Sequence, residues 1–404
     1  MACTPPVAAP TTAPCGAIAP QSLLAAFAAV PDPRRQASVD YPLAAVLALA
    51  VVAILARRLA LLAIAAWAAR PGDAVLGPLG FAAGRTPVQS TRQRRFARLE
   101  SDRLSDALRA HFQPGAAPDP QARGGQGVAI DGKAQRGRRR FPAGGSLVHA
   151  RTAFCHEQGV VLAQEPSDSA ADKAEAELTV APALLARVDW RGRVLTGDAL
   201  CCQRKRCRQV RDAGGDDLLV VRENQPTLLA DLALLFDPPP GVAAPPLLDR
   251  RAAVTLERGH GRTDDRRHLV ASTDLNAYLD WPGVAQVFRL ERTWRERGRR
   301  KGQSHYGLTS LPPDLAPPAR PLALHRGHWQ SENRLHHPKD TTLGEDASLT
   351  HAGAGPTVMA LLRDTALSLL RRAGHRAIAR HLRAHADHPL LALALVVAPP
   401  HAHA

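Results

Sequence analysis

Two short apolar runs that each end in an aspartate constrain the fold of this chain most. Residues 128–130 lead directly into Asp131, and residues 193–197 lead into Asp198. A short apolar run bounded by turn residues is typical of a buried strand. Side chains at the carboxyl ends of neighbouring strands meet at one edge of an open α/β sheet. The sequence therefore predicts two carboxylates at one edge of a sheet.

The pattern around these runs predicts a mixed α/β sheet. Three early strands, a helix, a strand, a helix and a strand follow one another in that order. The expected strands cover residues 128–130, 147–154, 160–164, 193–197 and 218–221, and the expected helices cover 170–188 and 203–213.

Segments on both sides of this region have a different character. Residues 21–112 follow a helical pattern, and a proline-rich linker at 237–246 precedes several β-like runs that end near the prolines of 312–321. Helical patterns return at 325–335 and 356–386. We therefore expect a loose tail over 1–20, a small helical domain over 21–120, an α/β core built from 121–236 and 322–390, and a β-rich insertion over 237–321.

The charge balance indicates a polyanionic partner. The formal net charge is +15 and the isoelectric point is near 10.6, and a surplus of this size favours contacts with phosphates. Basic residues cluster at 91–98 in the helical region and at 292–301, where Trp294 lies among arginines. The first cluster fits either a DNA-binding domain or a solvated helix face. The second fits either stacking on an unpaired base or a solvated hairpin tip.

The longest apolar stretch and the cysteines set limits on location. Residues 42–56 are apolar for only about 15 positions, whereas a membrane-spanning helix needs roughly 20, so a buried helix is favoured over a membrane-associated basic protein. The six cysteines include no C-x-x-C pair, and a zinc site from Cys155, His156, Cys202 and Cys207 would have poor spacing. We expect reduced thiols and a cytoplasmic protein without a membrane span.

A third carboxylate, Glu332, lies on the predicted helix after the insertion. Clustered carboxylates repel one another unless divalent cations hold them. Mg²⁺ prefers a few carboxylates together with water and phosphate oxygens, and two such ions can activate an attacking oxygen and stabilise a leaving one. Asp131, Asp198 and Glu332 therefore form a candidate metal site for phosphodiester chemistry.

Several motifs in a fixed order resemble those of insertion-sequence DDE transposases of the ISAs type, which include the H-repeat-associated proteins. The resemblance runs from about residue 31 to residue 370. The segments that carry it are 129–133, 195–200 with Gln203, 222–226, 259–262, and 328–336 followed by Asp340, Glu345 and Asp346. The departures are Arg222 in place of a lysine, Asp264 in place of a glutamate, and 337–339 in place of an aromatic and apolar stretch.

The resemblance implies an RNase H-like catalytic core with a β-rich insertion, preceded by a small helical N-terminal domain. It implies that Asp131, Asp198 and Glu332 are the catalytic residues and hold Mg²⁺ or Mn²⁺, with two ions in each site. The implied activity is cleavage and strand transfer on double-stranded DNA, at the terminal inverted repeats of the element and at a target, by a homodimer. The alternative is an inactive, DNA-binding relic of such an enzyme.

Further residues are candidates for DNA contacts. Lys339 lies seven positions after Glu332, although Pro338 argues against a continuous helix between them, and His328 lies four positions before Glu332. Asn224 and Gln225 follow a predicted strand, where they fit a DNA contact, support of the second aspartate, or a turn closed by Asn and Pro. The full set is Lys133, Asn224, Gln225, Arg262, Arg266, Arg292, Arg326, His328 and Lys339.

Overall fold

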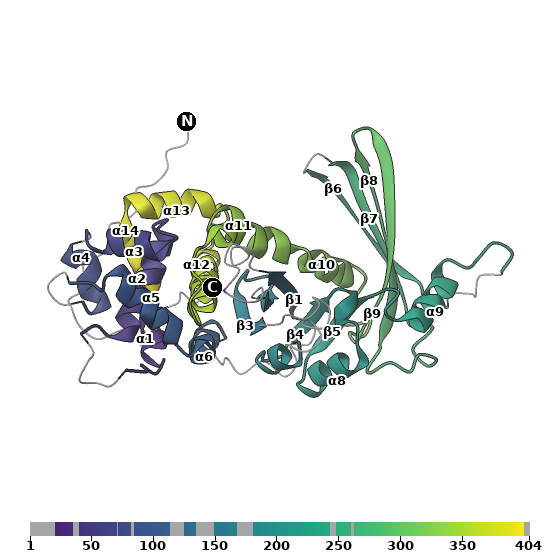
Figure 1. Ribbon diagram of the computed structural model, residues 1–404. Coiled ribbons are helices and arrows are strands. Elements are labelled where there is room, and N and C mark those ends of the chain that lie inside the picture. The colour runs from purple at the N-terminus through teal and green to yellow at the C-terminus, as the bar shows by residue number, and fades with distance from the viewer. Residues whose placement is uncertain are drawn as a thin grey trace.

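Nine strands form one mixed sheet in the computed structural model of this chain (Figure 1). The structure describes residues 21–34, 40–70, 72–81, 85–113, 125–134, 149–167, 181–242, 248–259 and 262–399. The tail expected over residues 1–20 lies outside the described residues, as does most of the helix expected over 170–188, of which residues 181–186 are helical.

The first five strands make the half of the sheet that carries the two aspartates. They are β1 (Gln126–Ala134), β2 (His149–Cys155), β3 (Val161–Ser167), β4 (Arg193–Gly197) and β5 (Asp216–Val221). β1, β2 and β3 pair antiparallel, whereas β1, β4 and β5 run parallel. The 3-10 helix η5 (Ala199–Cys201) and helix α8 (Arg204–Asp212) connect β4 to β5. The α/β order expected from the apolar runs is therefore present.

The strands expected in the insertion extend this same sheet. They are β6 (Arg251–Gly259), β7 (Arg262–Ser272), β8 (Gln286–Glu296) and β9 (Arg299–Thr309). β9 pairs antiparallel with β5, and the remaining strands follow in the order β9, β8, β7, β6. Helix α9 (Pro226–Phe236) precedes the insertion and packs against β8 and β9. Figure 1 shows these long strands projecting beyond the body of the molecule as an arm.

Helices from both ends of the chain form a bundle on the other side of the sheet (Figure 1). At its centre, α2 is apolar on all sides and has all but one of its 13 residues buried, as expected for a helix surrounded by others. No helix in the described ranges is long and apolar enough to cross a membrane. The bundle helices are α1 (Leu23–Ala28), α2 (Leu43–Leu55), α3 (Leu61–Ala68), α4 (Asp73–Leu76), η2 (Gly77–Leu79), α5 (Gln89–Arg98), α6 (Ser101–Phe112), α12 (Gly355–Arg372), α13 (Ile378–Asp387) and α14 (Pro389–Val397).

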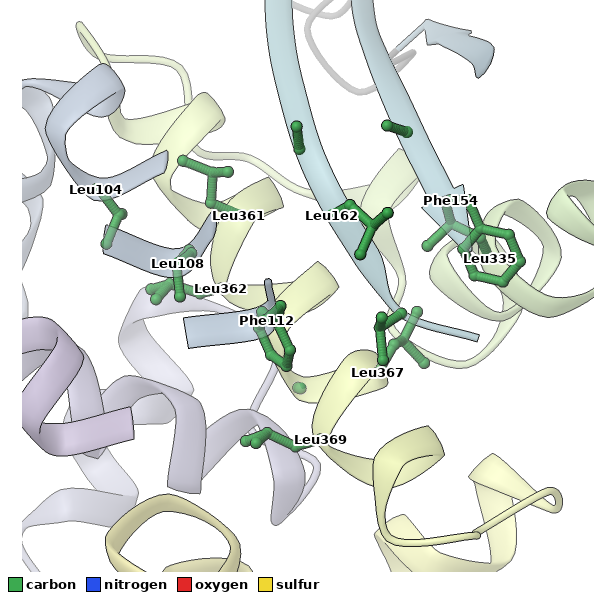
Figure 2. Close-up of a cluster of buried hydrophobic side chains, with 14 of the residues drawn as sticks. Leu104, Leu108, Phe112, Phe154, Leu162, Leu335, Leu361, Leu362, Leu367 and Leu369 are labelled. Carbon is green, nitrogen blue, oxygen red and sulfur yellow. The ribbon is translucent and has the colours of Figure 1, made fainter. Parts of the chain in front are cut away.

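Helix α12 joins the bundle to the sheet. It packs against α2, α5 and α6 on one side and against β3 on the other. Figure 2 shows Leu361 and Leu362 of α12 near Leu108 of α6, and Leu367 near Leu162 of β3. These side chains belong to one buried cluster that extends from the N-terminal helices into the sheet. The helical domain and the sheet therefore share a core.

The opposite face of the sheet is covered by α10 (Ala319–His328). Leu322 and Leu324 of this helix pack in a second buried cluster with Val194 and Leu218, from β4 and β5. The chain then continues through a π-helical turn (Glu332–His336) into α11 (His337–Thr341) and the 3-10 helix η7 (Glu345–Ala347). In Figure 1, α10 lies over β1, and α11 continues from it towards the helical bundle.

Candidate active site

Strand register places Asp131 and Asp198 level with each other. Ala129 of β1 lies opposite Thr196 of β4 in a parallel pair, and both aspartates follow two positions later. Because side chains alternate along a strand, Asp131 faces away from the cluster that contains Ile130, on the face covered by α10. Asp198 directly follows the last residue of β4 and is exposed. The expected gathering of two aspartates at one sheet edge is thus built by two neighbouring parallel strands.

Two glycines allow α10 to approach this edge closely. His156 lies between Gly127 of β1 and Gly327 of α10, and a Cβ atom at either glycine would lie only 2.3 Å or 2.1 Å from its Nδ1. The His156 Nε2 is 3.0 Å from the Thr196 hydroxyl. Burial, together with the charges of the nearby His328, Arg320 and Arg334, lowers the pKa of His156 to about 3. The ring is therefore a neutral spacer between helix and sheet.

Glu332 begins the π-helical turn that follows α10. The backbone N–H of His337 donates to the Glu332 carbonyl, five residues back, which widens the turn. Pro338 was expected to interrupt the helix, but that expectation is wrong, since Pro338 lies in the first turn of α11, where proline is tolerated. Arg334 secures the turn by donating to the backbone carbonyl of His156 at 2.5 Å.

Asp131 is held by three hydrogen bonds. Its Oδ2 accepts from the Ser331 hydroxyl at 3.0 Å and lies 3.1 Å from the His336 Nε2, and its Oδ1 accepts from the backbone N–H of Gly132 at 2.8 Å. Burial raises the pKa of Asp131, but the hydrogen bond and charge of His336, the charge of His328 and the Ser331 hydroxyl together hold it well below its usual range. The carboxylate is therefore ionised and fixed in orientation.

Asp131, Glu332 and His336 offer a compact set of ligand atoms. One such atom from each lies within 4.8 Å of the other two. Two carboxylate oxygens and an imidazole nitrogen at this spacing fit a divalent cation. Asp198 is outside this group, although its backbone is level with Asp131. In the described part of the chain, the cysteines at 155, 202 and 207 form no comparable group with His156.

His328 ends α10, close to the start of the Glu332 turn. Burial lowers the pKa of His328, and the charges of Asp131 and Asp198 raise it in part. His328 is only 9% exposed, and its Nδ1 is buried without a hydrogen-bond partner among the described residues.

The two lysines expected to contact DNA are both in ion pairs. The ammonium of Lys133 lies 2.5 Å from a carboxylate oxygen of Asp340 on α11, and its side chain is 11% exposed. Lys339 is 3% exposed and pairs with Asp364 at 2.8 Å and with Glu345 at 3.4 Å. The expected phosphate contact of Lys339 is therefore wrong for this structure, because its charge is buried and neutralised within the protein.

Asn224 and Gln225 support the loop that follows Asp198. The Asn224 amide donates to the Ala199 carbonyl at 2.6 Å, and the Gln225 amide donates to the Cys202 carbonyl at 3.0 Å. These bonds connect the turn after β5 to η5. These contacts fit support of the second aspartate, and residues 223–225 also form a turn before Pro226. A DNA contact of the two amides stays a prediction.

The remaining DNA-contact candidates lie in the arm and on α10. Arg266 of β7 is exposed, and Arg262 opens the same strand. Arg292 of β8 donates to both oxygens of Asp265, at 3.0 Å and 2.5 Å, and lies 5.0 Å from the centre of the Trp294 ring. Arg326 is half-buried on α10. The structure thus separates these arginines into an arm group and one residue near Glu332.

Ser331 and His336 were not among the site residues predicted from the sequence. Ser331 directly precedes Glu332, and His336 follows it by four positions, a spacing that places side chains on neighbouring turns of one helix face. That spacing was the available signal for His336. Its partner Asp131 lies about 200 positions earlier and is brought near by the fold alone.

Comparison with known proteins agrees with this geometry. The family model described as "Transposase DDE domain" matches residues 122–370, and the model described as "DDE_Tnp_1-associated" matches residues 24–112. "Putative transposase YncI" of Escherichia coli O157:H7 is 28% identical over 87% of this chain and 87% of its own length. "H repeat-associated putative transposase YhhI" of Escherichia coli K12 is 27% identical over 60% of this chain and 63% of its own. The chain therefore belongs to the DDE transposases of insertion sequences.

Proposed function

We propose that this transposase binds the terminal inverted repeats of its element, cuts phosphodiester bonds there with Mg²⁺ or Mn²⁺, and joins the freed 3′ ends to target DNA. The observation that carries the proposal is the approach of Asp131 and Glu332, from distant parts of the chain, to a common site within 4.8 Å. Asp198 completes the proposed set of metal ligands from the neighbouring strand. Three oxygen ligands suit two divalent cations.

The fold supports an RNase H-like catalytic core. Three antiparallel strands followed by two parallel strands carry both aspartates, and the β-rich insertion lies between β5 and the helix that leads to Glu332. This is the arrangement implied by the resemblance to the ISAs type. The core and its insertion share one sheet, so the arm is fixed to the site by continuous strand pairing.

The side chains of this site have separate tasks. Asp131, Asp198 and Glu332 would hold two divalent cations, which would supply activation of the attacking oxygen and stabilisation of the leaving 3′ oxygen of the cut strand. Ser331 and His336 hold the Asp131 carboxylate in one orientation. Asn224 and Gln225 brace the loop after Asp198. None of these tasks requires a covalent link between protein and DNA.

DNA would reach this edge along basic surfaces. Arg266 is exposed on the arm and Arg326 is half-buried beside the site, and guanidinium groups suit phosphate contacts. Arg262 and Arg292 belong to the same arm. Joining requires that two element ends are held together. We therefore propose that the working complex contains at least two copies of the chain.

The test is cleavage of labelled DNA that carries the element's end, in Mg²⁺ and in Mn²⁺. We expect the wild-type protein to nick at the end and to join the product to a target plasmid. Asp131→Asn and Glu332→Gln should bind the same DNA and lose cleavage by at least about a thousandfold, as expected when a metal-dependent step is removed. Binding by the wild type without cleavage in either metal would favour the inactive relic.

A further inference from the structure

We propose that His336 is a nitrogen ligand of the cation held by Asp131 and Glu332, so that this site has a mixed oxygen and nitrogen donor set. The proposal rests on the proposed function, which assigns the cation to the carboxylates alone. It adds a ligand and a metal preference.

Position and burial both favour this role for His336. It ends the π-helical turn that Glu332 begins, and it is only 4% exposed. One of its ring nitrogens lies within 4.8 Å of ligand oxygens of both Asp131 and Glu332. Separations within 4.8 Å are compatible with one cation that contacts all three atoms.

The ring is also oriented towards the cation position. Its Nε2 lies 3.1 Å from Asp131 Oδ2, and the same oxygen is fixed by Ser331. A cation bound by Nε2 and the carboxylate would take the place of the proton in this hydrogen bond, so His336 would hold Asp131 through the cation instead. The opposite nitrogen, Nδ1, is buried and has no hydrogen-bond partner in the described ranges. Among those residues, the hydrogen-bond partner of the ring therefore lies on its Nε2 side, and this is the side that a cation would occupy.

A nitrogen ligand changes which cation the site prefers. Mg²⁺ favours oxygen donors, whereas first-row transition ions accept imidazole nitrogen readily. We therefore expect Mn²⁺ to bind more tightly than Mg²⁺, and we expect His336→Gln to weaken Mn²⁺ binding by about tenfold while changing Mg²⁺ binding less.

Pulsed electron paramagnetic resonance of Mn²⁺ bound to the full-length protein tests the ligand directly. The expected result is a ¹⁴N coupling in the wild type that disappears in His336→Gln. His337→Gln is the matched control, because His337 is the exposed neighbour on the same helix and its substitution should preserve the coupling. In wild-type protein labelled with ¹⁵N-histidine, the ¹⁴N coupling should be replaced by a ¹⁵N coupling, which tests histidine ligation without any substitution.

The outcomes separate this inference from the proposed function. If Mn²⁺ binds and Asp131→Asn abolishes binding, but the wild type shows no nitrogen coupling, His336 is not a ligand and the metal site of the proposed function stands. A coupling that persists in His336→Gln also overturns the inference. Mn²⁺ binding that is unchanged by Asp131→Asn would contradict the proposed function itself.

Discussion

Asp217 is a buried acid whose ionisation the fold opposes. It lies on β5 with no exposed surface, and neither carboxylate oxygen has a hydrogen-bond partner among the described residues. Burial raises the pKa of Asp217 to about 7, with Arg211 opposing the shift and Asp216 adding to it. The folded state therefore prefers the protonated form of this side chain.

The raised pKa predicts a loss of stability as pH increases. The contribution of protonated Asp217 is complete below the ordinary pKa of about 4 and disappears as pH rises to about 7. Asp217→Asn, which keeps the shape of the neutral acid, should be more stable than the wild type above pH 7, by a few kcal/mol at most, and similar below pH 4. Urea unfolding at several pH values measures this difference. A constant difference across the range would contradict the assignment.

Lys339 shows why a single position cannot be interpreted from spacing alone. Its distance from Glu332 along the chain suggested a phosphate contact, but its partners Asp364 and Glu345 come from two other elements. The carboxylates stabilise the charged form, so the pKa of Lys339 is raised despite the opposing effect of burial. Removing one partner of such a buried group costs roughly 3–5 kcal/mol, which makes Lys339 part of the framework around α11.

At the scale of elements, the strands that carry site residues were easier to predict than the turn that carries Glu332. The strands were predictable, because short apolar runs ending in Asp131 and Asp198 identify β1 and β4. The π-helical turn at Glu332 was not, because neither an apolar run nor a periodic pattern marks the hydrogen bond from His337 to Glu332 that defines it. The position of Glu332 therefore required the tertiary structure.

The turn after β5 gives a prediction at this scale. Asn224→Ala combined with Gln225→Ala removes the two bonds to the loop after Asp198, so the cleavage rate of the saturated complex should fall about tenfold, as expected for a misplaced catalytic group. Affinity for end DNA should change little. Gln209→Ala is the control, because the Gln209 amide also donates to a backbone carbonyl, that of Pro182. A loss of affinity with an unchanged rate would instead indicate direct contact with DNA.

At the scale of the whole molecule, regions that the sequence pattern divides into separate domains share a buried core and a sheet. The N-terminal helical region, the sheet and the C-terminal helices share one buried cluster, and the insertion shares the sheet of the core. Patterns along a sequence show where elements begin and end but not which distant faces pack together. The net charge of +15 was visible at once, whereas the projecting arm appears only in the fold (Figure 1).

The tip of the arm gives a prediction about DNA affinity. Arg297, Arg299 and Arg300 are exposed at the turn between β8 and β9. Replacing all three by Gln should reduce the salt dependence of DNA binding, with the slope of log K against log salt falling by up to about 0.9 for each lost phosphate contact. The matched control replaces the exposed Arg376, Arg380 and Arg383 at the opposite end of the molecule. Equal slopes for both variants would exclude the tip as a DNA contact.

The most direct test of a metal site built from Asp131, Asp198 and Glu332 is the cleavage activity of Asp198→Asn. Asp198 is the one proposed ligand outside the compact group of Asp131, Glu332 and His336, and its assignment depends on strand register. We expect Asp198→Asn to bind end DNA like the wild type but not to nick it in Mg²⁺ or Mn²⁺. Nicking at the wild-type rate would contradict a site built from three carboxylates.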